Sequence, residues 1–168
     1  PGGLPVDGVT NWSNGFMPSL FQGTVLRPKE PRILNLDAPP YLRGELQRQN
    51  LDLLQTLNRR HLKRHPGEAD LEARIASYEL AYRMQTSVPE LMDLSQESDE
   101  TFKLYGEDAR QPGTFAACCL NARRLAERGV RNIQIFHRGW DAHGNLPKEH
   151  ESQCQDVDQA CAALIKDL

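Results

Sequence analysis

The sequence predicts an α/β fold that is rich in helix, with a helical hairpin and at least one core strand. Two observations support this prediction. Apolar residues recur at helical spacing over long parts of the 168-residue chain. In the final third, the predicted elements follow the order helix, strand, polar loop and helix, which is half of a repeating α/β unit. We therefore expect residues 1–168 to form a single, incomplete domain.

The first part of the chain, 1–40, is predicted to be an ordered covering loop with short strands. It is rich in glycine, proline and asparagine, which are turn and breaker residues. Two apolar runs, 24–26 and 33–36, are candidate strands, and the prolines around them restrict both to an edge. Aromatic residues such as Trp12 and Phe16 favour burial over a disordered linker.

Residues 41–105 are predicted to form a helical hairpin followed by short helical turns. Four leucines fall at helical spacing and predict one apolar face: Leu46, Leu53, Leu54 and Leu57. Pro66 and Gly67 end this helix, and a second stripe that starts at Leu71 predicts a helix that returns antiparallel to the first.

Residues 106–168 are predicted to form helix, strand, loop and helix. Pro112 suits the first position of a helix, and Gly129 suits its end. The apolar run at 130–136 follows this glycine turn and predicts a buried strand. A polar loop then leads into the closing helix.

The ends of the chain predict an internal piece of a larger protein without a complete active site. The chain starts at Pro1 and finishes in an apolar helical run that carries no stop signal. A lone buried strand leaves its backbone groups unpaired, so we expect sequence outside this chain to supply its neighbours. If the piece folds alone, another copy has to cover the strand, which predicts a homo-oligomer.

Composition excludes several classes of partner and cofactor. The formal net charge of −3 gives no strong field for nucleic acid. No apolar run approaches the roughly 20 residues that span a bilayer. The glycine-rich phosphate loops of nucleotide-binding proteins are missing, so no nucleotide cofactor is expected.

The densest group of reactive residues lies in the loop that follows the predicted strand. Three of the five histidines fall there: His137, His143 and His150. In open α/β sheets, ligands bind outside the carboxyl ends of the strands. Asp141 and His143 share one side of an extended segment and suit Zn²⁺ and other divalent ions. We predict Asp141 and His143 as metal ligands, with His137 and His150 as weaker candidates and no assigned catalytic residue. The alternative is a polar turn without a function.

Four stretches of the chain resemble a known family. They are PGGLPVDG (1–8) with NW (11–12), DLEARIASYELA (70–81) with RMQ (83–85), ARRL (122–125) with ERGVR (127–131), and GWDAHG (139–144). In order and spacing they are similar to the sulfatase-like proteins of domain-of-unknown-function family 1501, in the alkaline phosphatase superfamily. The resemblance covers nearly the whole chain.

The resemblance implies a doubly wound alkaline-phosphatase-like core and metal-dependent hydrolysis of sulfate or phosphate esters. The implied cofactor is Zn²⁺, Ca²⁺ or Mn²⁺, the implied substrate is a small-molecule or glycan ester, and the implied location of the parent protein is periplasmic or extracellular. Asp141 and His143 match a family motif that follows a core strand and contributes to the metal site.

The family's Gly-Gly-Pro-Ser-His, Gly-Glu-Phe-Gly-Arg and Gly-Arg-Asp-His segments do not occur in this chain. We therefore expect a fragment that is inactive in isolation. The alternative is a non-catalytic binding or assembly protein on a hydrolase-like scaffold, because a fold does not fix a function.

Overall fold

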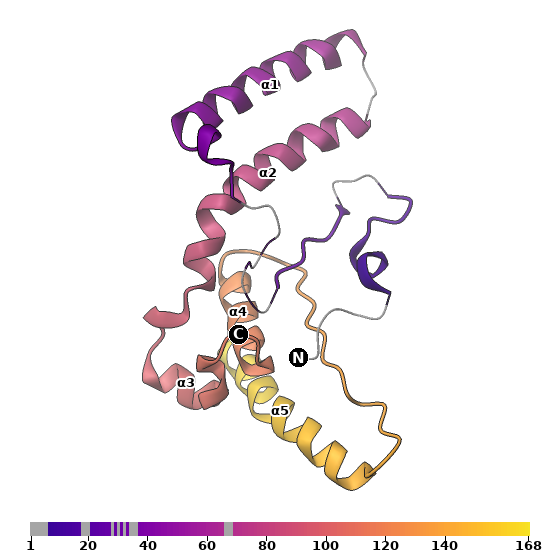
Figure 1. Ribbon diagram of the computed structural model, residues 1–168, viewed down its shortest axis with the longest axis vertical. Coiled ribbons are helices and arrows are strands. Elements are labelled where there is room, and N and C mark those ends of the chain that lie inside the picture. Colours follow the sequence, from indigo (N-terminus) through magenta and orange to yellow (C-terminus); the bar gives the residue numbers. More distant parts are fainter. Residues whose placement is uncertain are drawn as a thin grey trace. The chain divides into compact units, whose positions relative to one another are not determined.

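The computed structural model describes residues 7–17, 21–27, 29, 31, 33, 37–65 and 69–168 (Figure 1). For 9, 69–77 and 86 the description covers the backbone. The chain divides into two compact units, and each is described by itself. One unit contains Glu90–Leu168 with the described part of 27–32, and the other contains the described parts of 7–26 and 33–89. The expectation of a single incomplete domain stays a prediction.

Every regular element in the described part of the chain is a helix. In chain order these are η1 (Gly8–Trp12), η3 (Pro40–Leu42), α1 (Glu45–Arg64), α2 (Ala69–Met92), η4 (Leu94–Gln96), α3 (Asp99–Tyr105), η5 (Glu107–Arg110), α4 (Phe115–Glu127) and α5 (Leu146–Asp167), where η marks a 3₁₀ helix.

The predicted α/β fold is wrong for the described residues, which contain no strand and no sheet. Residues 130–142 are extended, as Figure 1 shows between α4 and α5, but no neighbouring strand pairs with them. Val130 and Ile133 are exposed, and Ile135 packs against a cluster of helical side chains. The apolar pattern that predicted a buried strand therefore belongs to a connection that packs Ile135 and His137 against the helices.

Two further expectations concern the opening segment. Residues 24–26 lie outside any sheet, and Phe16 is fully exposed, so the covering loop does not bury it. Of the second candidate strand, residues 34–36 lie outside the described residues.

Helices α1 and α2 form the predicted hairpin. Gln47, near the start of α1, donates from Nε2 to Oε1 of Gln85, near the end of α2, at 2.7 Å. Arg48 contacts Glu79 at 3.2 Å. These contacts make the two helices antiparallel (Figure 1). The face of α1 that meets α2 is therefore mixed, because Leu51 and Leu54 also line a small pocket with Tyr78 of α2.

The predicted apolar face of α1 is not a packing face. Its four leucines are 44–58% exposed: Leu46, Leu53, Leu54 and Leu57. Helix α2 also runs further than predicted, through Pro89 to Met92. Proline lacks the N–H of a helical hydrogen bond, so the α2 ladder loses one bond at this position.

The Glu90–Leu168 unit has a core built largely from small side chains. Its buried members are Phe102, Tyr105, Ala109, Ala116, Cys119, Leu120, Ala160 and Ala163. Helix α4 packs against α5, and α3 packs against both. Alanines at the contact let the α4 and α5 backbones approach closely, and α5 consequently buries Ala160 and Ala163, whereas Cys161 and Leu168 are exposed.

Local capping sets the ends of the helices in this unit. Thr114 is the N-cap of α4, and its hydroxyl accepts a hydrogen bond from the amide of Ala117 at 3.1 Å. Pro112 lies in the preceding turn, so the predicted start of this helix was too early by three residues. Gly129 follows α4 with a φ of +86°, a conformation that favours glycine, and confirms the predicted end.

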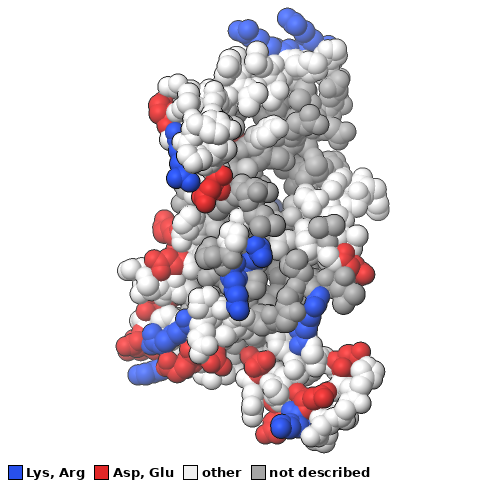
Figure 2. Space-filling model, in the orientation of Figure 1, with Lys and Arg blue, Asp and Glu red and all other residues white. Residues whose placement is uncertain are grey.

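Acidic and basic side chains are interspersed on the face in Figure 2, without an extended patch of either sign. Within the part of the chain that the structure describes, no helix combines the length and apolarity that crossing a bilayer requires.

Candidate functional site

Asp141 and His143, the two predicted metal ligands, lie in contact. Oδ1 of Asp141 is 3.0 Å from Nε2 of His143. The side chains are 90% and 84% exposed, so both face solvent at the end of the 130–142 connection. A carboxylate and an imidazole in contact, open to solvent, can offer two donors to a cation.

His137 lies apart from this pair and is anchored on the helices. Its side chain is 8% exposed, and Nε2 is 3.5 Å from Oδ2 of Asp156 on α5. The ring packs edge-on against Phe115 and Trp140, at 5.1 and 5.9 Å between ring centroids. Nδ1 is buried and has no hydrogen-bond partner among the described residues. His137 therefore packs like a core residue.

His150 lies in the first turns of α5, and its side chain is exposed. Its ring contacts that of Trp140 in a T-shaped arrangement, with 6.0 Å between the centroids. The structure thus links His137, Trp140 and His150 through ring contacts. Of the four predicted site residues, Asp141 and His143 contact each other, whereas His137 pairs with Asp156.

The described residues contain no group of three or more histidine, cysteine, aspartate and glutamate side chains that could hold a metal ion. Catalytic zinc sites use three protein ligands and structural sites use four. Asp141 and His143 have the donor atoms that suit a divalent cation, but they supply two of the three or four protein ligands that such a site needs. Their role as metal ligands stays a prediction.

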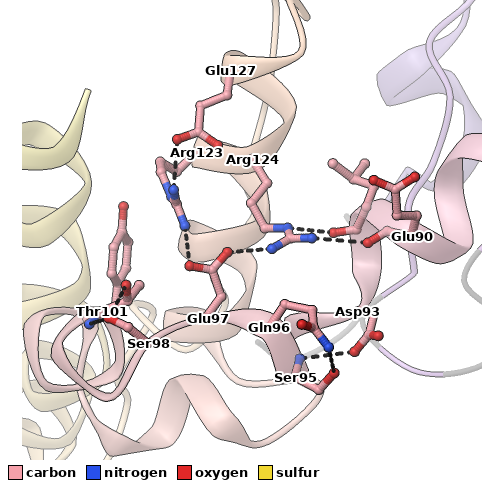
Figure 3. A network of polar contacts seen from close by, with 12 residues as sticks. Glu90, Asp93, Ser95, Gln96, Glu97, Ser98, Thr101, Arg123, Arg124 and Glu127 are labelled. Carbon is pink, nitrogen blue, oxygen red and sulfur yellow. Dashed lines mark hydrogen bonds and ion pairs between the residues drawn. The ribbon is translucent and has the colours of Figure 1, made fainter.

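A buried network of charges lies beside α4 (Figure 3). Glu97 accepts hydrogen bonds from Arg123, at 2.6 Å from Nη2, and from Nη1 of Arg124. The three side chains are 10–14% exposed. Arg124 also donates to the carbonyl oxygens of Leu91, at 2.8 Å, and Glu90, at 3.0 Å. Carbonyls in the last turn of a helix lack helical partners, so Arg124 completes the end of α2.

The network changes the acidity of Glu97. Burial alone would favour the neutral carboxylic acid, but the hydrogen bonds and charges of Arg124 and Arg123 outweigh it, and the pKa of Glu97 falls below its usual value. A pKa that is lower in the folded than in the unfolded protein stabilises the fold above the unfolded pKa. That contribution is lost as the pH falls through the folded pKa.

We therefore expect acid to destabilise the Glu90–Leu168 unit as the pH drops below the usual glutamate pKa of 4.5. Urea unfolding at neutral pH and at about pH 3 measures the difference. Glu97→Gln is the matched variant, and it should be less stable at neutral pH and lose less stability on acidification. Equal acid sensitivity of both proteins would contradict this assignment.

A cleft of about 530 Å³ opens between the segment that carries η4 and α3 and the start of α4. Its lining residues are Met92, Asp93, Leu94, Ser95, Glu97, Asp99, Phe102, Arg110, Pro112, Gly113, Ala117, Cys118 and Asn121. Sequence reasoning missed this cleft. The available signal was Asn121, an amide among the apolar residues of the buried face of α4.

Fold and site together define a helical protein with a solvent-facing carboxylate–imidazole pair and a separate cleft lined by polar and apolar side chains. The chain belongs to the family described as Protein of unknown function (DUF1501), which it matches over residues 1–168. Comparison with curated proteins and with solved structures finds no match.

Proposed function

We propose that this chain contributes Asp141 and His143 to the metal site of a hydrolase of sulfate or phosphate esters. The observation that carries the proposal is the 3.0 Å contact between the two side chains in solvent. The similarity of the GWDAHG motif to the sulfatase-like proteins of the alkaline phosphatase superfamily supports the class of reaction.

The contact also suggests how the two side chains divide their roles. When one imidazole nitrogen faces a carboxylate, the other is free to coordinate a metal, and the carboxylate orients the ring. Nε2 of His143 faces Asp141, which leaves Nδ1 for the cation. A bound divalent ion would neutralise the charge of the ester and activate a nucleophile. The remaining ligands have to come from residues other than the described ones, so we expect no hydrolysis by this chain alone.

Paramagnetic Mn²⁺ tests whether the Asp141–His143 pair binds a metal ion, even if binding is weak. We expect Mn²⁺ to broaden the NMR signals of 139–145 selectively, and Asp141→Ala to reduce that broadening several-fold. Asp158→Ala is the matched control, because Asp158 is an exposed carboxylate on α5 that forms no ion pair with the described residues. Broadening that follows all surface carboxylates equally, or survives in Asp141→Ala, would contradict the proposal.

A non-catalytic binding or assembly protein is the second candidate. The half-exposed leucines of α1 favour it, since the described residues leave this apolar face uncovered. Activity separates the two candidates. A hydrolase should cleave nitrophenyl sulfate or phosphate as the metal-loaded full-length protein and lose most of that rate in Asp141→Ala, whereas an assembly protein should cleave neither ester.

A further inference from the structure

The cleft beside α4 contains a buried polar group that the fold does not satisfy. Asn121 is 7% exposed and lines the cleft. Its Oδ1 is buried and has no hydrogen-bond partner among the described residues. Buried amides are nearly always hydrogen-bonded, and leaving one without a partner costs stability. A ligand that donates a hydrogen bond would remove this cost.

Most of the charged groups around the cleft neutralise one another. Glu97 is bound by two arginines of α4. Asp99 accepts from Nη2 of Arg110 at 2.6 Å. The guanidinium of Arg110 also lies 4.0 Å from the centroid of the Phe102 ring, and this cation–π contact holds the arginine against the side of the cleft.

Asp93 is the exception among the charged lining residues. It caps η4, and its Oδ1 accepts from the amide of Ser95 at 3.0 Å (Figure 3). Within the described part of the chain it forms no ion pair. The cleft therefore keeps one carboxylate outside its ion pairs, on which the charge of Arg124 acts through space, and one acceptor without a donor among the described residues.

Much of the remaining lining is apolar, so the part of the ligand that contacts it should be a hydrocarbon. Met92 is buried and Leu94 is half-buried, and Phe102 and Ala117 add further apolar surface. A volume of about 530 Å³ lies within the range of small-molecule sites. The complementary molecule has a short hydrocarbon body and a cationic group with several N–H donors.

We propose that this cleft binds a primary alkylammonium compound, with the ammonium group near Asp93 and Asn121. The proposal is independent of the Asp141–His143 pair, because the lining residues of the cleft lie outside residues 137–150. A metal ion is a poorer fit, since the described residues gather no three ligating side chains here.

Pentylamine and pentan-1-ol form a matched pair of probes, equal in length and different in charge. Titration of each into the ¹⁵N-labelled chain, followed by NMR, measures where and how tightly each one binds. We expect pentylammonium to shift the signals of cleft residues with an affinity up to about fivefold above that of pentanol, the effect of one exposed charge pair.

Two variants locate the binding groups. Asparagine caps a helix as well as aspartate does, so Asp93→Asn removes the charge and keeps the cap. In Asp93→Asn the two probes should bind equally, and in Asn121→Ala pentylammonium should bind several-fold more weakly. Asp158→Asn should leave both affinities unchanged.

Circular dichroism checks that each variant is folded before it is titrated. Equal binding of the two probes to the unaltered chain would overturn the cationic assignment. Shifts outside the cleft, or unchanged affinity in both Asp93→Asn and Asn121→Ala, would overturn the site.

Discussion

Replacing Leu120 by alanine is expected to lower the free energy of unfolding by about 3–5 kcal/mol. Leu120 has no exposed surface and lies in the core of the Glu90–Leu168 unit. The loss combines the transfer energy of the removed carbon atoms with the cost of the cavity they leave. Its small neighbours Ala116 and Ala160 cannot reach into that cavity, so the expected effect is at the upper end for this kind of change.

Ile165→Ala is the control for Leu120→Ala. Ile165 is 80% exposed on α5, and its replacement should change stability by about 0.5 kcal/mol or less. Urea unfolding followed by circular dichroism measures both variants. If the two substitutions cost the same, Leu120 does not occupy the core that the structure assigns to it.

Arg124→Met is the second change with a large expected effect. It should lower the free energy of unfolding by about 3 kcal/mol, because it leaves the buried partners of Arg124 without their hydrogen-bond donor. Glu97 would keep only Arg123, and the carbonyls of Glu90 and Leu91 would lose the guanidinium that completes the end of α2. Methionine retains most of the side-chain volume, so the measured loss reports the polar contacts rather than a cavity.

Two companion variants sharpen the Arg124 experiment. Arg128→Met removes an exposed ion pair with Glu90 at 3.1 Å and should cost about 0.5 kcal/mol or less. Arg124→Lys keeps the charge but lacks the planar fork of donors, so it should restore little of the lost stability. Full rescue by lysine in thermal unfolding would mean that charge alone, rather than directed hydrogen bonds, holds the network.

Helices were predictable here because their signals are local. The breaker pair at 66–67 separates α1 from α2, and Gly129 ends α4. The faces through which the helices pack were less predictable. Periodicity shows that a helix has an apolar stripe, but it does not show which element packs against that stripe. On α1 the side that meets α2 carries Gln47 and Arg48 as well as apolar residues. On α5 the alanines at 160 and 163 are the buried residues, because small side chains allow close approach.

The 130–136 run shows the limit of local patterns most clearly. Its alternation suits a strand, yet a strand exists only with a partner, and none of the described residues provides one. The approach of Asp141 to His143 followed from their spacing of two residues along an extended segment. The cleft could not be predicted in the same way, because Asp93 and Asn121 are far apart in sequence and line the same cleft only after folding.

Glu97 serves two adjacent arginines at once, which restricts how this part of the protein can evolve. A mutation of Glu97 alone would leave two neighbouring positive charges with low exposure and no shared counter-ion. A mutation of either arginine would leave the glutamate underpaired. Residues that share one network combine non-additively, so acceptable changes at 97, 123 and 124 should arise as compensated sets. The three positions would then be inherited as one unit, even though 26 residues of sequence separate Glu97 from Arg123.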